Sequence, residues 1–99
     1  MPNPDRIVIN TSPTIAIIAA LGDLKVLQSL YRQVFVPYEV SQEILYGGSG
    51  RFGQSEFEEA NWLFKSQEAL EILPILSNSL DRGEAAVIQL ALNKGISTV

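Results

Sequence analysis

Several oxygen-bearing side chains in this sequence are spaced so that they could share a divalent cation. Asn10 directly follows the apolar run 7–9, and Glu43 lies about two turns into a segment that starts at a proline. Asp81 and Glu84 stand at the start of a segment rich in alanine and leucine. In an open parallel sheet, ligands collect at the ends of strands and the first turns of the helices that follow them. Because carboxylate and amide oxygens are the ligands that Mg²⁺ and Mn²⁺ prefer, these positions indicate a cation site.

Each of these residues also has an ordinary structural explanation. Asn10 and Ser12 are typical N-cap residues, and Asp81 followed by Glu84 has the spacing of a capping box. Glu43 alone is most simply a solvated helix residue. Acids that do cluster repel one another by about 4 kcal/mol per close pair at an effective dielectric near 20. A bound cation offsets that repulsion, could lower the pKa of a water and could neutralise charge on a phosphodiester.

Composition narrows the chemistry further. The chain has 99 residues, no cysteine and no histidine, so thiolate or imidazole metal sites and Ser-His-Asp catalysis are excluded. A net charge of −4 argues against a broad basic nucleic-acid surface. The start lacks the layout of a signal peptide, and the longest apolar stretch, 15–21, is far shorter than the roughly 20 residues of a membrane span. We expect a soluble, cytoplasmic protein of one domain.

The order of elements predicts an α/β fold. Apolar and β-branched runs predict strands, whereas helical spacing between capping residues, prolines and glycines predicts helices. Strands are expected at 7–9, 34–36, 62–64 and 96–99; helices are expected at 14–21, after a cap at Asp23, from Pro37, and at 54–60, 72–80 and 82–93. The helix at 14–21 is apolar almost all round, which predicts that it is buried. Alternation of this kind gives a central parallel sheet with helices on its faces.

Three segments in series carry a resemblance to a known family. They are Ile9-Asn10-Thr11-Ser12-Pro13-Thr14-Ile15-Ala16, then Val36-Pro37 with Val40 and Glu43-Ile44-Leu45, and finally Leu80-Asp81-Arg82-Gly83-Glu84-Ala85-Ala86-Val87-Ile88-Gln89-Leu90-Ala91. The chain resembles the PIN domain family, in particular the PIN-like toxins of bacterial and archaeal toxin–antitoxin pairs. The resemblance extends from Ile7 to Val99. It implies a three-layer α-β-α fold and a Mg²⁺- or Mn²⁺-dependent ribonuclease with a quartet of acids at the carboxyl ends of the strands.

The resemblance also implies roles for individual residues. Asn10 stands where most members have the first Asp, Glu43 stands at the second acid and Glu84 at the third, with Asp81 close by. These four would bind the metal, with Glu43 and Glu84 as the catalytic acids, and Ser12 would contact substrate. The fourth acid would follow the strand at 96–99, where this chain ends. We therefore expect one PIN-like domain over 1–99, incomplete at its C-terminus, with a weakened metal site because Asn10 is neutral.

Competing functions follow from these features. The first is a toxin-type ribonuclease that acts on RNA and is inhibited by a cognate antitoxin protein. The second is a non-catalytic PIN remnant that binds a protein partner, motivated by Asn10 and the missing fourth acid. A third, a response-regulator-like domain, is weaker because no predicted strand ends in Asp. The apolar strand at 96–99 would be an exposed edge, which predicts a homodimer or larger assembly unless a loop covers it.

Overall fold

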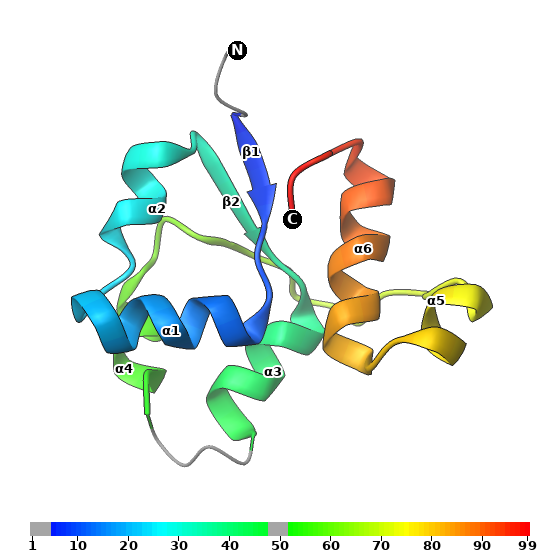
Figure 1. Ribbon diagram of the computed structural model, residues 1–99, viewed down its shortest axis with the longest axis horizontal. Helices are drawn as coiled ribbons and strands as arrows, with labels where there is room; N and C mark the ends of the chain where they lie inside the picture. Colours follow the sequence, from blue (N-terminus) through cyan, green and yellow to red (C-terminus); the bar gives the residue numbers. More distant parts are fainter. Residues whose placement is uncertain (1–4, 48–51) are drawn as a thin grey trace.

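The computed structural model describes residues 5–47 and 52–99 of the chain. The predicted α/β class is confirmed: three parallel strands are flanked by helices (Figure 1). The elements in chain order are β1 (Arg6–Val8), α1 (Thr11–Leu21), α2 (Lys25–Leu30), β2 (Gln33–Val36), α3 (Tyr38–Tyr46), α4 (Gln54–Glu59), β3 (Phe64–Lys65), α5 (Pro74–Ser79) and α6 (Arg82–Lys94).

The sheet has the strand order β1-β2-β3 and is parallel throughout. Ile7 pairs with Val34 across the first ladder, and Phe35 pairs with Phe64 across the second. Val8 on β1, like Val34 and Val36 on β2, is essentially buried, as expected for parallel strands covered on both faces. These short β-branched strands therefore form the centre of the core and fix where the helices that follow them begin.

Only part of α1 is buried, so the expectation for this helix was wrong. Its buried residues are Thr14 and Ile18, whereas Ala16, Ala19 and Ala20 face outward and Leu21 is 59% exposed. The helix packs one side against α3 and the hydrophobic core, and no element in the described part of the chain covers its other side (Figure 1). Apolar composition predicted burial, but the neighbours needed to provide it lie on one side alone. No helix within residues 5–47 and 52–99 has both the length and the apolarity to span a bilayer.

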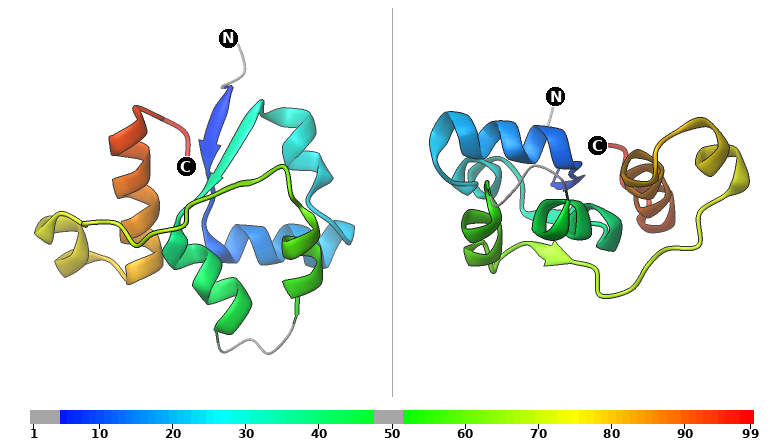
Figure 2. Two further views of the ribbon diagram at one scale, coloured as in Figure 1. Left: turned by 180° about the vertical axis from the view of Figure 1, so that it is seen from behind. Right: turned by 90° about the horizontal axis from the view of Figure 1, so that it is seen from below.

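The predicted strand at 96–99 does not form. Gly95 ends α6 in the left-handed conformation (φ 67°), and the Ile96 N–H donates to the Ala91 carbonyl at 2.9 Å. Because this N–H completes the helix terminus, it cannot join the sheet. The segment still lies beside β1, where the Val8 N–H donates to the Thr98 carbonyl at 3.1 Å (Figure 2).

Two smaller expectations also needed correction. The strand expected at 62–64 begins later, at Phe64, because Leu63 is held in a turn by its N–H bond to the Ala60 carbonyl. Asp23 is not the N-cap of α2; that position is Leu24, and Asp23 accepts a hydrogen bond from the Lys25 N–H instead. Neither change moves the carboxyl ends of β1 and β2, where the predicted site residues begin.

Candidate functional site

Asn10 caps α1 at the carboxyl end of β1. Its Oδ1 accepts a hydrogen bond from the Thr11 N–H at 2.8 Å, and its backbone carbonyl accepts one from the Thr14 hydroxyl at 2.6 Å. The side-chain carbonyl keeps a second lone pair, so capping does not prevent it from also binding a cation. Ser12, in the first turn of α1, is exposed. The structure thus places both residues at the strand end where the sequence predicted them.

Glu43 lies against the start of α6. Val40 and Ile44 bury one side of α3, which leaves Glu43 exposed at the rim where α3 meets α6. A Cβ atom on Gly83 would lie 3.2 Å from the Glu43 Cδ and would overlap its Oε1. The carboxyl group therefore occupies the space that any side chain at residue 83 would fill. Since Gly83 precedes Glu84, this contact brings the second and third predicted acids to one place.

Asp81 and Glu84 interact at the first turn of α6. The Asp81 Oδ1 accepts the Glu84 N–H at 2.9 Å, so Asp81 is the N-cap that the sequence predicted. A hydrogen bond from the Glu84 side chain, followed by the backbone bonds, lowers the pKa of Asp81. The pKa of Glu84 is raised, first by its hydrogen bond to Asp81 and by the Asp81 charge, and to a smaller extent by burial and the charge of Glu43. Asp81 and Glu43 thus both lie close enough to Glu84 to affect its ionisation.

The donor set suits a weakly held hard cation. Glu43, Asp81 and Glu84 are carboxyl groups; the hydrogen bond to Asp81 and then the charges of Asp81 and Glu43 raise the pKa of Glu84, and a bound cation relieves repulsion of this kind. Among residues 5–47 and 52–99, no three Asp, Glu, His or Cys side chains are arranged as a ready metal cage. Mg²⁺ rarely needs such a cage, because it keeps several waters and is often bound through one or two carboxylates together with substrate phosphates. Glu43 and Glu84 fit that mode of binding.

Glu39 is a functional candidate that sequence reasoning missed. Its side chain is only 2% exposed; Oε2 accepts the Leu70 N–H at 3.0 Å and lies 3.7 Å from Nη2 of Arg82, while Oε1 is buried without a hydrogen-bond partner among the described residues. It joins α3 to the segment before α5 and to α6, and so helps hold the helix that carries Glu43. The available signal was its position four residues before Glu43, on the same side of a helix.

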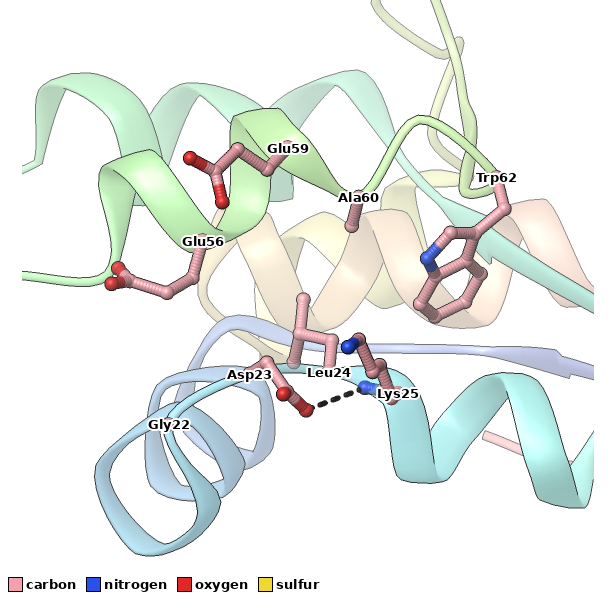
Figure 3. A pocket seen from close by; sticks show the side chains of 8 residues that line it. All are labelled: Gly22, Asp23, Leu24, Lys25, Glu56, Glu59, Ala60 and Trp62. Carbon is pink, nitrogen blue, oxygen red and sulfur yellow. Dashed lines mark hydrogen bonds between the residues drawn. The ribbon is translucent and has the colours of Figure 1, made fainter.

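A separate hollow of about 260 Å³ lies at the other end of α1, between the α1–α2 turn and α4. Asp23, Glu56 and Glu59 line it, together with Lys25 and Trp62 (Figure 3). Asp23 is turned toward the Lys25 backbone, to which it is hydrogen-bonded, and away from the two glutamates. This hollow shares no residue with the acids of α3 and α6, and it is not part of the candidate site.

The structure is an α/β domain with a parallel sheet and with acidic side chains gathered where α3 meets α6. A family model described as a PIN domain matches residues 6–99, nearly the whole chain. The chain therefore belongs to the PIN domain family. No curated protein and no solved structure matches it.

Proposed function

We propose that this chain is a Mg²⁺- or Mn²⁺-dependent ribonuclease of the PIN type. The observation that carries the proposal is the contact between the Glu43 carboxyl and Gly83, which sets Glu43 beside Glu84. Glu43 and Glu84 are the proposed catalytic acids, and Asn10 and Asp81 complete the proposed metal ligands. Ser12, exposed at the start of α1, is the proposed substrate contact.

The protein's own groups would act by position and charge. Glu43 and Glu84 hold negative charge at the rim of the sheet, while Asp81 accepts the Glu84 N–H and keeps the first turn of α6 in place. Asn10 adds a neutral oxygen, which gives weaker attraction than an aspartate would. A divalent cation bound there would supply charge neutralisation at a phosphodiester and a more acidic water.

The first test is cation binding. Adding Mn²⁺ or Mg²⁺ at millimolar concentration should raise the melting temperature of the wild-type chain, and Glu43→Gln or Glu84→Gln should abolish the rise. Glu59→Gln is the matched control, because Glu59 is an exposed glutamate on α4, away from the site. No cation-dependent stabilisation of the wild type, or an equal rise in Glu43→Gln, would contradict the proposal.

The second test is cleavage of RNA. Single-turnover reactions with Mn²⁺ and a mixed-sequence RNA should yield products with wild type and Glu59→Gln, and none with Glu43→Gln. The alternative function, a non-catalytic PIN module that binds a protein, is favoured by the neutral Asn10 and the absence of a three-acid cage in the described residues. Cation binding without any cleavage would support that alternative.

The biological setting proposed is that of a toxin whose partner is an antitoxin protein. Self-association into a homodimer or larger assembly is part of the same proposal, motivated by the short segment beside β1, which has one backbone bond to that strand. Sedimentation of the purified chain tests self-association. Growth arrest on expression, relieved by co-expression of the adjacent gene and lost in Glu43→Gln, tests the toxin role.

A further inference from the structure

One side of α3 carries aromatic and amide groups that the proposed metal site does not use. Tyr38, Gln42 and Tyr46 follow one another at intervals of four residues, so they lie along one face of the helix. Tyr46, in the last turn, is 77% exposed, which is unusual for so large a ring. An exposed aromatic side chain beside a polar stripe is a common feature of ligand-binding surfaces.

This face forms one wall of a hollow between α3 and the first turn of α6. The hollow has a volume of about 300 Å³, which is near the lower end for ligand sites. Glu39, Glu43 and Gly47 line it with the α3 face, and Arg82 closes it from α6. The first turns of α3 and α6 lie close together (Figures 1 and 2), and Glu43 is one of the residues that line the hollow between these helices.

Arg82 is placed to bind an anion at this hollow. Its side chain is 69% exposed, and its contact with Glu39 is a single ion pair at 3.7 Å. A guanidinium has five N–H donors in a planar fork, so one long contact leaves most of them available. Phosphate and carboxylate are the groups that such a fork binds in bidentate fashion.

The negative charge of the chain limits how a nucleic acid could bind in this hollow. With a net charge of −4 and Glu43 in the hollow, general electrostatic attraction cannot hold a nucleic acid here. Stacking on aromatic rings does not depend on net charge and is available to every base, provided that the base is unpaired. The combination of exposed Tyr46, the Gln42 amide and one arginine therefore fits the binding of one base and its phosphate better than many charge contacts along a nucleic-acid backbone.

We propose that this hollow is a subsite for one unpaired nucleotide of a single-stranded RNA. The base stacks on Tyr46, the Gln42 amide hydrogen-bonds its edge, and Arg82 binds its phosphate. The neighbouring phosphate then lies next to Glu43 and Glu84. The inference rests on the proposed ribonuclease function and adds to it the residues of α3 and α6 that bind the nucleotide beside the cleaved bond.

Binding to a strand that is not cleaved tests the subsite directly. In the Glu43→Gln background, a fluorescein-labelled oligouridine of roughly eight nucleotides is titrated with protein, with Mg²⁺ present, and followed by anisotropy. Tyr46→Leu should weaken binding about tenfold, while Tyr46→Phe, which keeps the ring, should bind as the parent does. With an abasic strand of equal length and charge, Tyr46→Leu and its parent should bind equally.

The role of Arg82 is tested through the salt dependence of RNA binding. Arg82→Ala should weaken binding and reduce the slope of log K against log salt by about 0.7, the value for one contact with a single-stranded phosphate. Lys25→Ala is the matched control, because it removes the same charge from an exposed position on α2. Lys25→Ala should leave the slope unchanged.

The outcomes separate the two proposals. Equal RNA affinity of Tyr46→Leu and its parent, or an equal loss on the abasic strand, would overturn the subsite even if Mn²⁺ stabilises the wild type as expected. Loss of RNA affinity in Tyr46→Leu without any cation-dependent stabilisation would support the subsite and contradict the metal site. Circular dichroism and melting of each variant check the fold: Tyr46→Leu should melt as the parent does because Tyr46 is exposed, whereas Arg82→Ala also removes the ion pair of the buried Glu39 carboxylate and should stay folded but melt at a lower temperature.

Discussion

Replacing Gly83 by alanine should weaken the proposed cation site while leaving the stability of the fold nearly unchanged. The added Cβ would overlap the Glu43 Oε1 and lie 3.2 Å from its Cδ, so the carboxyl must rotate away from α6. Glu43 is exposed, and the atoms that must move are at the end of a flexible side chain. The fold can therefore accept the substitution, whereas the position of the carboxyl beside Glu84 cannot be kept.

The substitution has two expected effects on the free energy of unfolding, and they are opposite in sign. Alanine is favoured over glycine in a helix by up to about 1 kcal/mol, and a side chain forced from its rotamer costs about 0.5–1.5 kcal/mol. The melting temperature should therefore stay within about 8 °C of wild type. A cation at about ten times its Kd stabilises by about 1.4 kcal/mol, and a tenfold loss of affinity leaves about 0.4 kcal/mol.

The assay is thermal unfolding of wild type and Gly83→Ala without Mn²⁺ and with Mn²⁺ at about ten times the wild-type Kd. A double-mutant cycle with Glu43→Ala gives the control: once the carboxyl is absent, Gly83→Ala should only stabilise, and it should not alter the cation response. A full Mn²⁺ response in Gly83→Ala would refute the reasoning, since it would show that the cation does not need Glu43 where the structure places it.

Other substitutions test the supporting structure. Asp81→Asn should bring the raised pKa of Glu84 down toward its ordinary value, because the hydrogen bond to a charged Asp81 carboxylate is lost together with the Asp81 charge; ¹³C NMR titration of the carboxyl groups measures this, and an unchanged Glu84 pKa would contradict it. In the wild type, cation affinity should fall as the pH drops through the raised pKa of Glu84, since protonation removes a ligand charge; calorimetry at several pH values checks this. Glu39→Ala should lower the free energy of unfolding by about 1–3 kcal/mol, because the Leu70 N–H loses its acceptor, and Glu39→Gln, which can keep that bond, should lower it less in urea titrations. Ile44→Ala should cost about 2–5 kcal/mol in the same titrations, since Ile44 is fully packed in the core; a loss below 1 kcal/mol would contradict that packing.

Local signals in the sequence were sufficient to predict much of the architecture. The β-branched runs located β1 and β2, and Asp81 was correctly predicted as the N-cap of α6, because capping depends on residues a few positions apart. The same local logic failed at Ile96. Its apolar character predicted a strand, yet its N–H is hydrogen-bonded to the end of α6.

What only the tertiary structure decided is which polar groups are buried and which meet. Glu39 and Glu43 are four residues apart on one helix, yet Glu39 is enclosed by the segment at Leu70 and by Arg82, whereas Glu43 stays at the rim. Sequence spacing could place Glu43 on α3 and Glu84 on α6, but their proximity depends on Gly83, which lets the Glu43 carboxyl reach the backbone of the other helix. Burial and contact of this kind are set by residues distant in the chain, so no local pattern of apolar and polar residues contains them.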